Sequence, residues 1–184
     1  MLKKLFGGSL IALCCSAAYA APQQWNFTYT GFHDVAANSF LPAEVLHGVF
    51  GGEDRNRDGV IGVAELSQLV VAGVDFISCQ TQQFFECGIG VFSYKPGAAL
   101  DFKVDYFAHD PEFLVRAGGV ITTGVAQYRY RDEPGQHTER TLNWTPGTTL
   151  LVSAVPEPTT YGMLAFGLGL VGVAARRQRR FLRS

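Results

Sequence analysis

The residues with the clearest chemistry are oxygen donors at alternating positions of one twelve-residue segment, 54–65. The donors are the side chains of Asp54, Asn56 and Asp58, the backbone carbonyl of Val60 and the side chain of Glu65. Alternate residues of such a loop face inward, and carboxylate, amide and carbonyl oxygens are the ligands that Ca²⁺ prefers. The spacing therefore predicts a calcium site in which the final glutamate closes the shell with two oxygens.

This segment resembles the calcium-binding loops of EF-hand and dockerin-type proteins. The resemblance covers residues 54–65 only, with Gly59 at the sharp turn, Ile61 packing inward and Gly62 leaving its position to a water molecule. No second loop of this kind is present to pair with it. The resemblance implies a fixed structural site of the weak extracellular grade, with a dissociation constant of roughly 10⁻⁴–10⁻³ M. The alternative is an Asx-rich turn that binds no ion.

The other polar residues form no recognisable catalytic pattern. The histidines are scattered, and none pairs with a cysteine or another histidine at metal-ligand spacing. The sequence contains neither a Gly-x-Ser-x-Gly elbow nor a phosphate-binding glycine loop. We therefore expect no enzymatic activity. The alternative is a secreted hydrolase with a carboxylate pair among the acidic residues of 101–112.

The segment Tyr128-Arg129-Tyr130-Arg131 alternates aromatic and cationic side chains. Such a surface can bind sugars or single-stranded nucleic acid. We favour the simpler interpretation, in which the tyrosines pack on one face of a strand and the arginines face Glu139 and Asp132 on its neighbour.

Most of the chain has the pattern of short β-strands. Period-2 alternation predicts strands over 25–32, 119–131, 138–144 and 148–152, and a hairpin over 91–107 that turns at Pro96-Gly97. Residues 45–50 suit either a strand or a short helix, and 65–72 have the three- and four-residue apolar spacing of a helix that ends at Gly73. The fold class expected is mainly β, an antiparallel β-sandwich or small barrel with one short helix.

The charges are distributed unevenly along the chain. The formal net charge is −1, from 15 basic and 16 acidic residues. Seven of the basic residues lie at the two ends, so the segment between them holds eight against all 16 acidic residues, a net charge of −8. This acidic segment lacks the basic surface that releases counterions from a phosphate backbone, which excludes a nucleic-acid partner. It attracts cations instead.

The first 20 residues have the pattern of a secretory signal peptide. Lys3 and Lys4 precede an apolar stretch, and Ala18-Tyr19-Ala20 is a small-x-small cleavage site. Mature protein would begin at Ala21, and an extracytoplasmic domain would cover 21–152. The alternative is a first membrane helix.

The last 32 residues, 153–184, form a second targeting segment with three parts. A linker over 155–159 contains Pro156, Glu157 and Pro158, an uncharged apolar stretch covers 160–175, and an arginine-rich tail covers 176–184. As a helix of 1.5 Å per residue, the apolar stretch spans roughly 24 Å, close to the ~30 Å hydrocarbon core of a membrane. The arginines place the tail in the cytoplasm.

These three parts, in this order, resemble the PEP-CTERM sorting signal of Gram-negative bacteria. The resemblance implies an inner-membrane precursor that is recognised by an exosortase, a membrane cysteine protease-transferase, and released to the cell envelope or extracellular matrix. It covers the C-terminal segment alone. The alternative is a permanent single-pass anchor.

Only Cys79 and Cys87 remain after removal of the predicted leader, which contains Cys14 and Cys15. A single pair in an oxidising compartment predicts one disulfide, worth roughly 2–3 kcal/mol in the chain-entropy model. Metal ligation and a redox pair are the alternatives.

Together these features predict an exported, calcium-binding structural protein of the envelope or matrix, with exopolysaccharide as a partner that the sorting resemblance suggests. The alternative function is a carbohydrate-binding, adhesin- or lectin-like module that uses exposed aromatic residues such as Tyr130 and Trp144.

Overall fold

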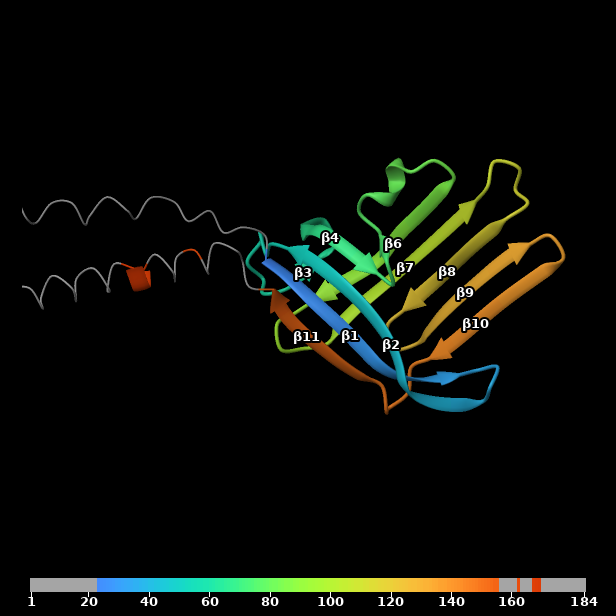
Figure 1. The fold of residues 1–184 in the computed structure, drawn as a ribbon. Coiled ribbons are helices and arrows are strands. Elements are labelled where there is room, and N and C mark those ends of the chain that lie inside the picture. The colour runs from blue at the N-terminus through green and yellow to red at the C-terminus, as the bar shows by residue number, and fades with distance from the viewer. Residues whose placement is uncertain (1–22, 156–161, 163–166, 170–184) are drawn as a thin grey trace, which may run out of the picture.

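The computed structural model describes residues 23–155, 162 and 167–169. Within them the chain forms eleven strands and two short 3-10 helices (Figure 1). Their bounds are β1 Gln23–Asp34, β2 Ser39–Gly52, β3 Ile61–Gly62, η1 Val63–Glu65, β4 Leu66–Val71, β5 Val74–Asp75, η2 Cys79–Thr81, β6 Phe85–Tyr94, β7 Leu100–His109, β8 Arg116–Thr122, β9 Ala126–Glu133, β10 Gln136–Asn143 and β11 Thr149–Val155.

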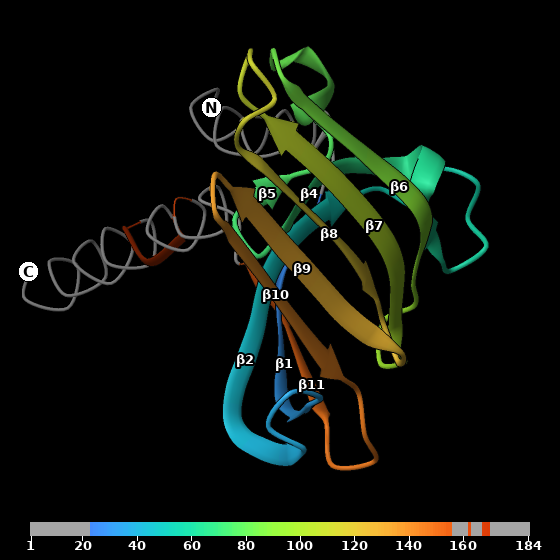
Figure 2. The same cartoon turned by 90° about the vertical axis from the view of Figure 1, so that its right-hand side faces the viewer.

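All eleven strands belong to one antiparallel sheet. Its order is β3-β6-β7-β8-β9-β10-β1-β2-β4-β5, and β11 pairs with β1 beside this path. The mainly β, antiparallel prediction is therefore confirmed. The structure differs from the predicted sandwich or small barrel, because the strands form a single open sheet. The two halves of this sheet nevertheless pack face to face, as the view in Figure 2 and the ring contacts below indicate.

The strand β1 takes part in both halves because it changes neighbour along its length. Its residues 24–30 pair with β11, whereas His33 and Asp34 pair with β10. Between these two stretches the register with β2 shifts, and Gly31 lies there at a φ of +86°. A side chain at this position would place its Cβ 2.8 Å from the ring of Phe40. Bulges of this kind turn strands at the corner between packed layers.

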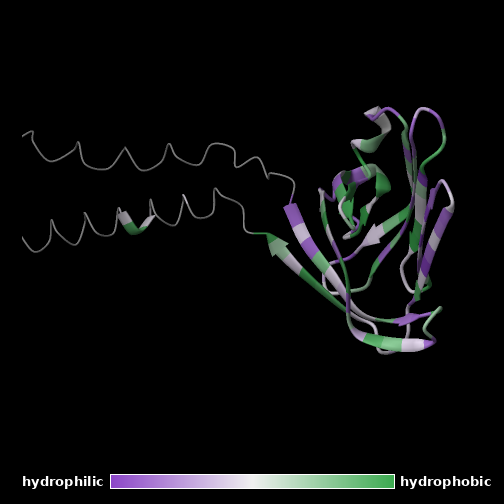
Figure 3. Cartoon of the chain, turned by 45° about the vertical axis from the view of Figure 1, so that its right-hand side comes forward, coloured by the Kyte–Doolittle hydropathy of each residue, from purple (hydrophilic) through white to green (hydrophobic). Residues whose placement is uncertain are grey.

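Aromatic side chains fill the space between the two halves. The rings of Phe27 on β1 and Phe102 on β7 have centroids 5.5 Å apart, and those of Phe50 on β2 and Tyr94 on β6 are 4.8 Å apart. Hydrophobic and hydrophilic residues alternate along many strands (Figure 3). The largest fully buried side chains are those of Phe27, Phe32, Phe50, Phe76, Phe102, Leu46, Leu69, Leu100, Ile121, Leu142, Val71 and Val104.

The helix predicted over 65–72 is wrong. After the 3-10 turn of η1, residues 66–71 form strand β4, which pairs with the end of β2. Leu69 and Val71 are both fully buried with half-buried Val70 between them, which is the period of a strand. Pairing with a distant strand has overridden a local pattern that suited a helix. Gly73, the expected helix end, lies in the turn before β5 at a φ of +85°.

The strand predicted over 119–131 is wrong, because a turn at residues 123–125, with Gly124 at a φ of +72°, divides it into the antiparallel neighbours β8 and β9. The other expected strands are confirmed, and the ambiguous 45–50 segment is part of β2. The predicted signal peptide, 1–20, lies outside the described residues, as does most of the apolar stretch 160–175. None of the helices that the structure describes has the length and hydropathy needed to cross a membrane.

Substitution of Gly48 on β2 tests the packing of β2 against Phe27 of β1. A Cβ at this position would lie 2.1 Å from the ring of Phe27, which covers the glycine, and 2.5 Å from the carbonyl oxygen of Val70. We expect Gly48→Ala to lower the free energy of unfolding by about 1–3 kcal/mol, because the buried ring must move. Urea denaturation measures the change. Gly90→Ala on β6 is the control, since its nearest neighbour would be at 3.6 Å; equal effects of the two substitutions would contradict the packing argument.

Candidate functional site

The candidate calcium loop joins strands at opposite ends of the sheet order. The chain leaves β2, passes through the loop, and enters β3, which pairs with β6. It then returns through η1 to β4, which pairs with β2. The backbone N–H of Glu53 donates to the carbonyl oxygen of Glu65 at 3.2 Å and joins the two ends of the segment. Gly52 approaches so closely that a Cβ there would lie 2.7 Å from Ile61.

Three of the predicted ligands curl around one turn. The carboxylate of Asp54 accepts from the backbone N–H of Asp58 at 3.1 Å and from that of Gly59 at 2.8 Å. Asn56 Oδ1 also accepts from the N–H of Asp58, at 2.9 Å. Asp58 Oδ1 in turn accepts from the N–H of Val60 at 2.7 Å. These bonds close the loop, and Gly59 has the positive φ of +81° that the sharp turn requires.

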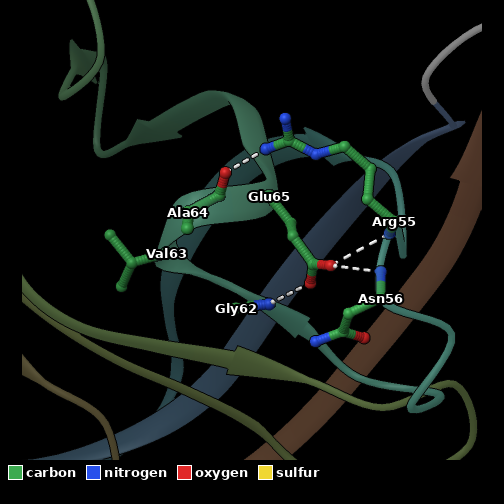
Figure 4. A pocket seen from close by; sticks show the side chains of 6 residues that line it. All are labelled: Arg55, Asn56, Gly62, Val63, Ala64 and Glu65. Carbon is green, nitrogen blue, oxygen red and sulfur yellow. Dashed lines mark hydrogen bonds between the residues drawn. The ribbon is translucent and has the colours of Figure 1, made fainter.

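Glu65 reaches back across the loop from η1 (Figure 4). Its Oε1 accepts from the backbone N–H of Arg55 at 2.9 Å and of Asn56 at 3.2 Å, and its Oε2 accepts from that of Gly62 at 3.1 Å. The N–H groups of Gly62, Asn56 and Arg55 hold the pKa of Glu65 below its ordinary value. The fifth predicted ligand is thus an ionised carboxylate turned toward the loop.

The donor set has the chemistry of a calcium site, with oxygen as its ligand element. The adjoining hollow has a volume of ≈ 650 Å³ and is lined by Arg55, Asn56, Gly62, Val63, Ala64 and Glu65. Within the described residues no group of three or more His, Cys, Asp or Glu side chains is arranged to hold a metal ion. The carboxylates of Asp54, Asp58 and Glu65 therefore do not converge as a set of three in this structure, and their oxygens accept backbone N–H groups of the loop. Ile61 is buried, as predicted.

The predicted disulfide is present. Cys79 in η2 and Cys87 on β6 are bonded, with their Cα atoms 6.2 Å apart. The bond joins the 3-10 turn to β6 beside Phe76, which is fully buried. The bond thereby attaches the connection between β5 and β6, whose only regular element is η2, to the sheet.

Comparison with known proteins identifies the C-terminal segment. Residues 154–180 match the model of the PEP-CTERM protein-sorting motif. The chain carries a PEP-CTERM sorting signal. This confirms the prediction made from Pro156, Glu157 and Pro158 and the residues that follow them. The motif implies an exported, membrane-sorted protein that an exosortase processes. No curated protein and no solved structure matches the chain.

The tyrosines and arginines of β9 occupy opposite faces of the sheet. The rings of Tyr128 and Tyr130 stack with centroids 6.0 Å apart, and the Tyr128 hydroxyl donates to Glu139 at 3.3 Å. The expected pairing of both arginines with Glu139 and Asp132 is wrong, because Glu139 lies opposite Tyr130 and shares the tyrosine face.

Trp144 does not provide the exposed aromatic surface that the carbohydrate-binding alternative expected. Its indole packs edge-on against Phe32, with centroids 4.8 Å apart, and against Tyr29 at 5.5 Å. Its Nε1 is buried and has no hydrogen-bond partner among the described residues. Trp144 is therefore part of the aromatic packing, and of the two named residues only Tyr130 stays on a solvent-facing side of the sheet.

The β9–β10 hairpin contains a titratable pair. His137 Nδ1 lies 2.5 Å from a carboxylate oxygen of Asp132, and its Nε2 lies 3.7 Å from Glu139. The hydrogen bond to Asp132, together with the charges of Asp132 and Glu139, raises the pKa of His137 above its ordinary value. Since the folded pKa is the higher one, the stabilisation is complete below the unfolded pKa of about 6.5 and is lost as pH rises through the folded pKa.

We expect Asp132→Asn to return the pKa of His137 toward its ordinary value, because the substitution removes the charge that stabilises the imidazolium. NMR titration of the imidazole measures the shift. Glu133→Gln is the control, since that carboxylate pairs with Arg131 instead. Identical titration curves for His137 in the wild type and in Asp132→Asn would contradict the assignment.

Proposed function

We propose that the protein is an exported, calcium-binding β-sheet module with a structural role in the cell envelope or extracellular matrix, and that it has no catalytic activity. The observation that carries the proposal is the loop 54–65, whose oxygen donors curl around one turn between the two ends of the sheet. Export is implied by the sorting motif. The matrix role rests on that motif alone.

The residues that would hold Ca²⁺ are the five donors described above. The side chains of Asp54, Asn56 and Asp58 would each supply oxygen, Val60 its carbonyl, and Glu65 two carboxylate oxygens. Gly62 has no side chain and would leave room for a water ligand. Bound calcium would supply a cross-link between these donors, and no chemical step is assigned to it.

Stabilisation by the ion would follow from the position of the loop. Because the segment 53–65 connects β2 to β3 and returns to β4, an ion bound there would hold both ends of the open sheet. An ion that binds only the folded state stabilises it by mass action, by about 1.4 kcal/mol at ten times the dissociation constant. That value corresponds to a rise of about 3–5 °C in melting temperature for a domain of this size.

The test of calcium binding is thermal melting of the full-length protein with calcium and with chelator. We expect calcium to raise the melting temperature of the wild type by about 3–5 °C and to leave that of Asp54→Ala unchanged. Asp75→Ala is the matched control, because this carboxylate also holds a turn, through the N–H groups of Ile77 and Ser78. It should lower the melting temperature while retaining the full calcium response. Equal melting temperatures of the wild type in calcium and chelator would refute the proposed site.

Processing is tested by mass spectrometry of the protein recovered from outside the producing cell. We expect a chain that begins at Ala21 and lacks the arginine-rich tail 176–184, because the exosortase acts near the Pro-Glu-Pro motif. The variant Glu157→Ala should retain the tail and stay in the membrane fraction. Recovery of exported wild type with an intact tail would contradict processing.

A further inference from the structure

A second hollow lies on β9 and β10, away from the calcium loop. It has a volume of ≈ 400 Å³ and is lined by Arg129, Tyr130, Arg131, Thr138, Glu139 and Arg140. We call it the arginine hollow. Its volume falls within the range of about 300–1,000 Å³ that is usual for small-ligand sites.

The arginine hollow places two cations directly opposite each other. Arg129 on β9 and Arg140 on β10 are register partners, so their side chains leave the same face of the sheet. Like charges at such positions are destabilising. Arg131 and Thr138 form the next pair on this face. Three arginines therefore lie together on one face of the β9–β10 hairpin.

Two of the three arginines are neutralised by neighbouring carboxylates. Arg140 donates to Asp34 at 3.1 Å and to both carboxylate oxygens of Glu44 at 3.0 and 3.1 Å. Arg131 is paired with Glu133 at 2.5 Å. Arg129 has no carboxylate within ion-pair distance among residues 23–155. Its positive charge is available to an incoming anion.

The guanidinium of Arg129 is also held in a fixed orientation. The amide oxygen of Gln127, in the orientation that satisfies its neighbours, accepts from Arg129 Nε at 2.8 Å and from Nη2 at 3.0 Å. Gln127 is itself only 3% exposed. Gly119 lies opposite Arg129 on β8, and a Cβ there would come within 3.1 Å of Arg129 Cγ and 2.9 Å of Tyr106. The amide of Gln127 thus fixes the Nε and Nη2 side of the Arg129 guanidinium, and Gly119 leaves room for its side chain. Within residues 23–155, the other N–H groups of the guanidinium are free to bind a ligand.

We propose that the arginine hollow binds the carboxylate of an acidic sugar, with Arg129 as the principal contact. A guanidinium presents two parallel N–H groups that match a carboxylate. The hydroxyl of Thr138, which lies on the same face as Arg129, supplies a hydrogen-bonding group for a sugar hydroxyl. This goes beyond the proposed function and assigns sugar recognition to other residues than Tyr130 and Trp144.

The test is titration of the full-length protein with a uronic acid tetrasaccharide, its neutral glucose counterpart and inorganic phosphate. We expect saturable binding of the uronic acid compound that weakens with added salt, and no binding of the neutral one. Arg129→Gln should weaken binding by about ten-fold or more, and Arg129→Lys by less, since it keeps the charge but loses the paired donors. Arg116→Gln is the control, because this arginine pairs with Asp132 and does not line the hollow.

Thermal melting of Arg129→Gln separates a binding role from a structural one. Arg129→Gln removes both donors of the buried Gln127 amide oxygen and should lower the melting temperature somewhat. The titrations are therefore run at a temperature at which this variant is fully folded, so that loss of binding there is not loss of the fold. The proposal is overturned if the wild type fails to bind the uronic acid compound, if phosphate binds and that compound does not, or if Arg116→Gln weakens binding as much as Arg129→Gln. These outcomes are independent of calcium binding, because each titration is repeated in chelator.

Discussion

The packing of one sheet against itself is the constraint on which the rest of the structure depends. A single open sheet of this size would expose an apolar face, and the aromatic rings of β1 and β2 bury it against β6 and β7. Phe27, Phe50 and Phe102 are fully buried as a result. Burial of one such side chain is worth about 1.5–3 kcal/mol. The fold therefore rests on contacts between strands that are not neighbours in the sheet.

This packing also decides where polar groups lie. On β7 the inward side chains change from the fully buried Phe102 and Val104 to the half-buried Tyr106. Arg129 stands in the same row as Tyr106 and Gly119, at the margin of the apolar region. Arg140 continues that row and is held by carboxylates from β1 and β2. The two candidate sites thus lie at different margins of the contact between the two halves of the sheet. The loop 54–65 lies where β2 and β4 approach β3 and β6, and the arginine hollow lies on β9 and β10.

The sequence predicts those features that depend on near neighbours along the chain. Alternating side chains were enough for most of the strands, although they missed the turn at 123–125 that separates β8 from β9. Asp54, Asn56 and Asp58 lie around one turn because their spacing is local. The segment 65–72 fails this rule, since Leu66, Leu69 and Val70 suit a helix as well as a strand. Pairing with β2, some twenty residues earlier, decides between them. The Arg129–Arg140 pair could not be predicted either, because it depends on the register of the β9–β10 hairpin. The bend at Gly31 could not be predicted because it depends on β1 pairing with different strands along its length.

The proposed calcium site and the disulfide place the protein in the same environment as its sorting signal. The Cys79–Cys87 bond is typical of oxidising compartments, where disulfides form and persist. A single loop of the extracellular grade would fill only where calcium is abundant. The precursor would therefore cross the membrane without either cross-link and gain both outside. The ion and the disulfide would then stabilise the sheet in the compartment to which the sorting motif directs it. The disulfide and the PEP-CTERM motif thus agree on an extracytoplasmic location, and the proposed calcium loop would act in the same compartment.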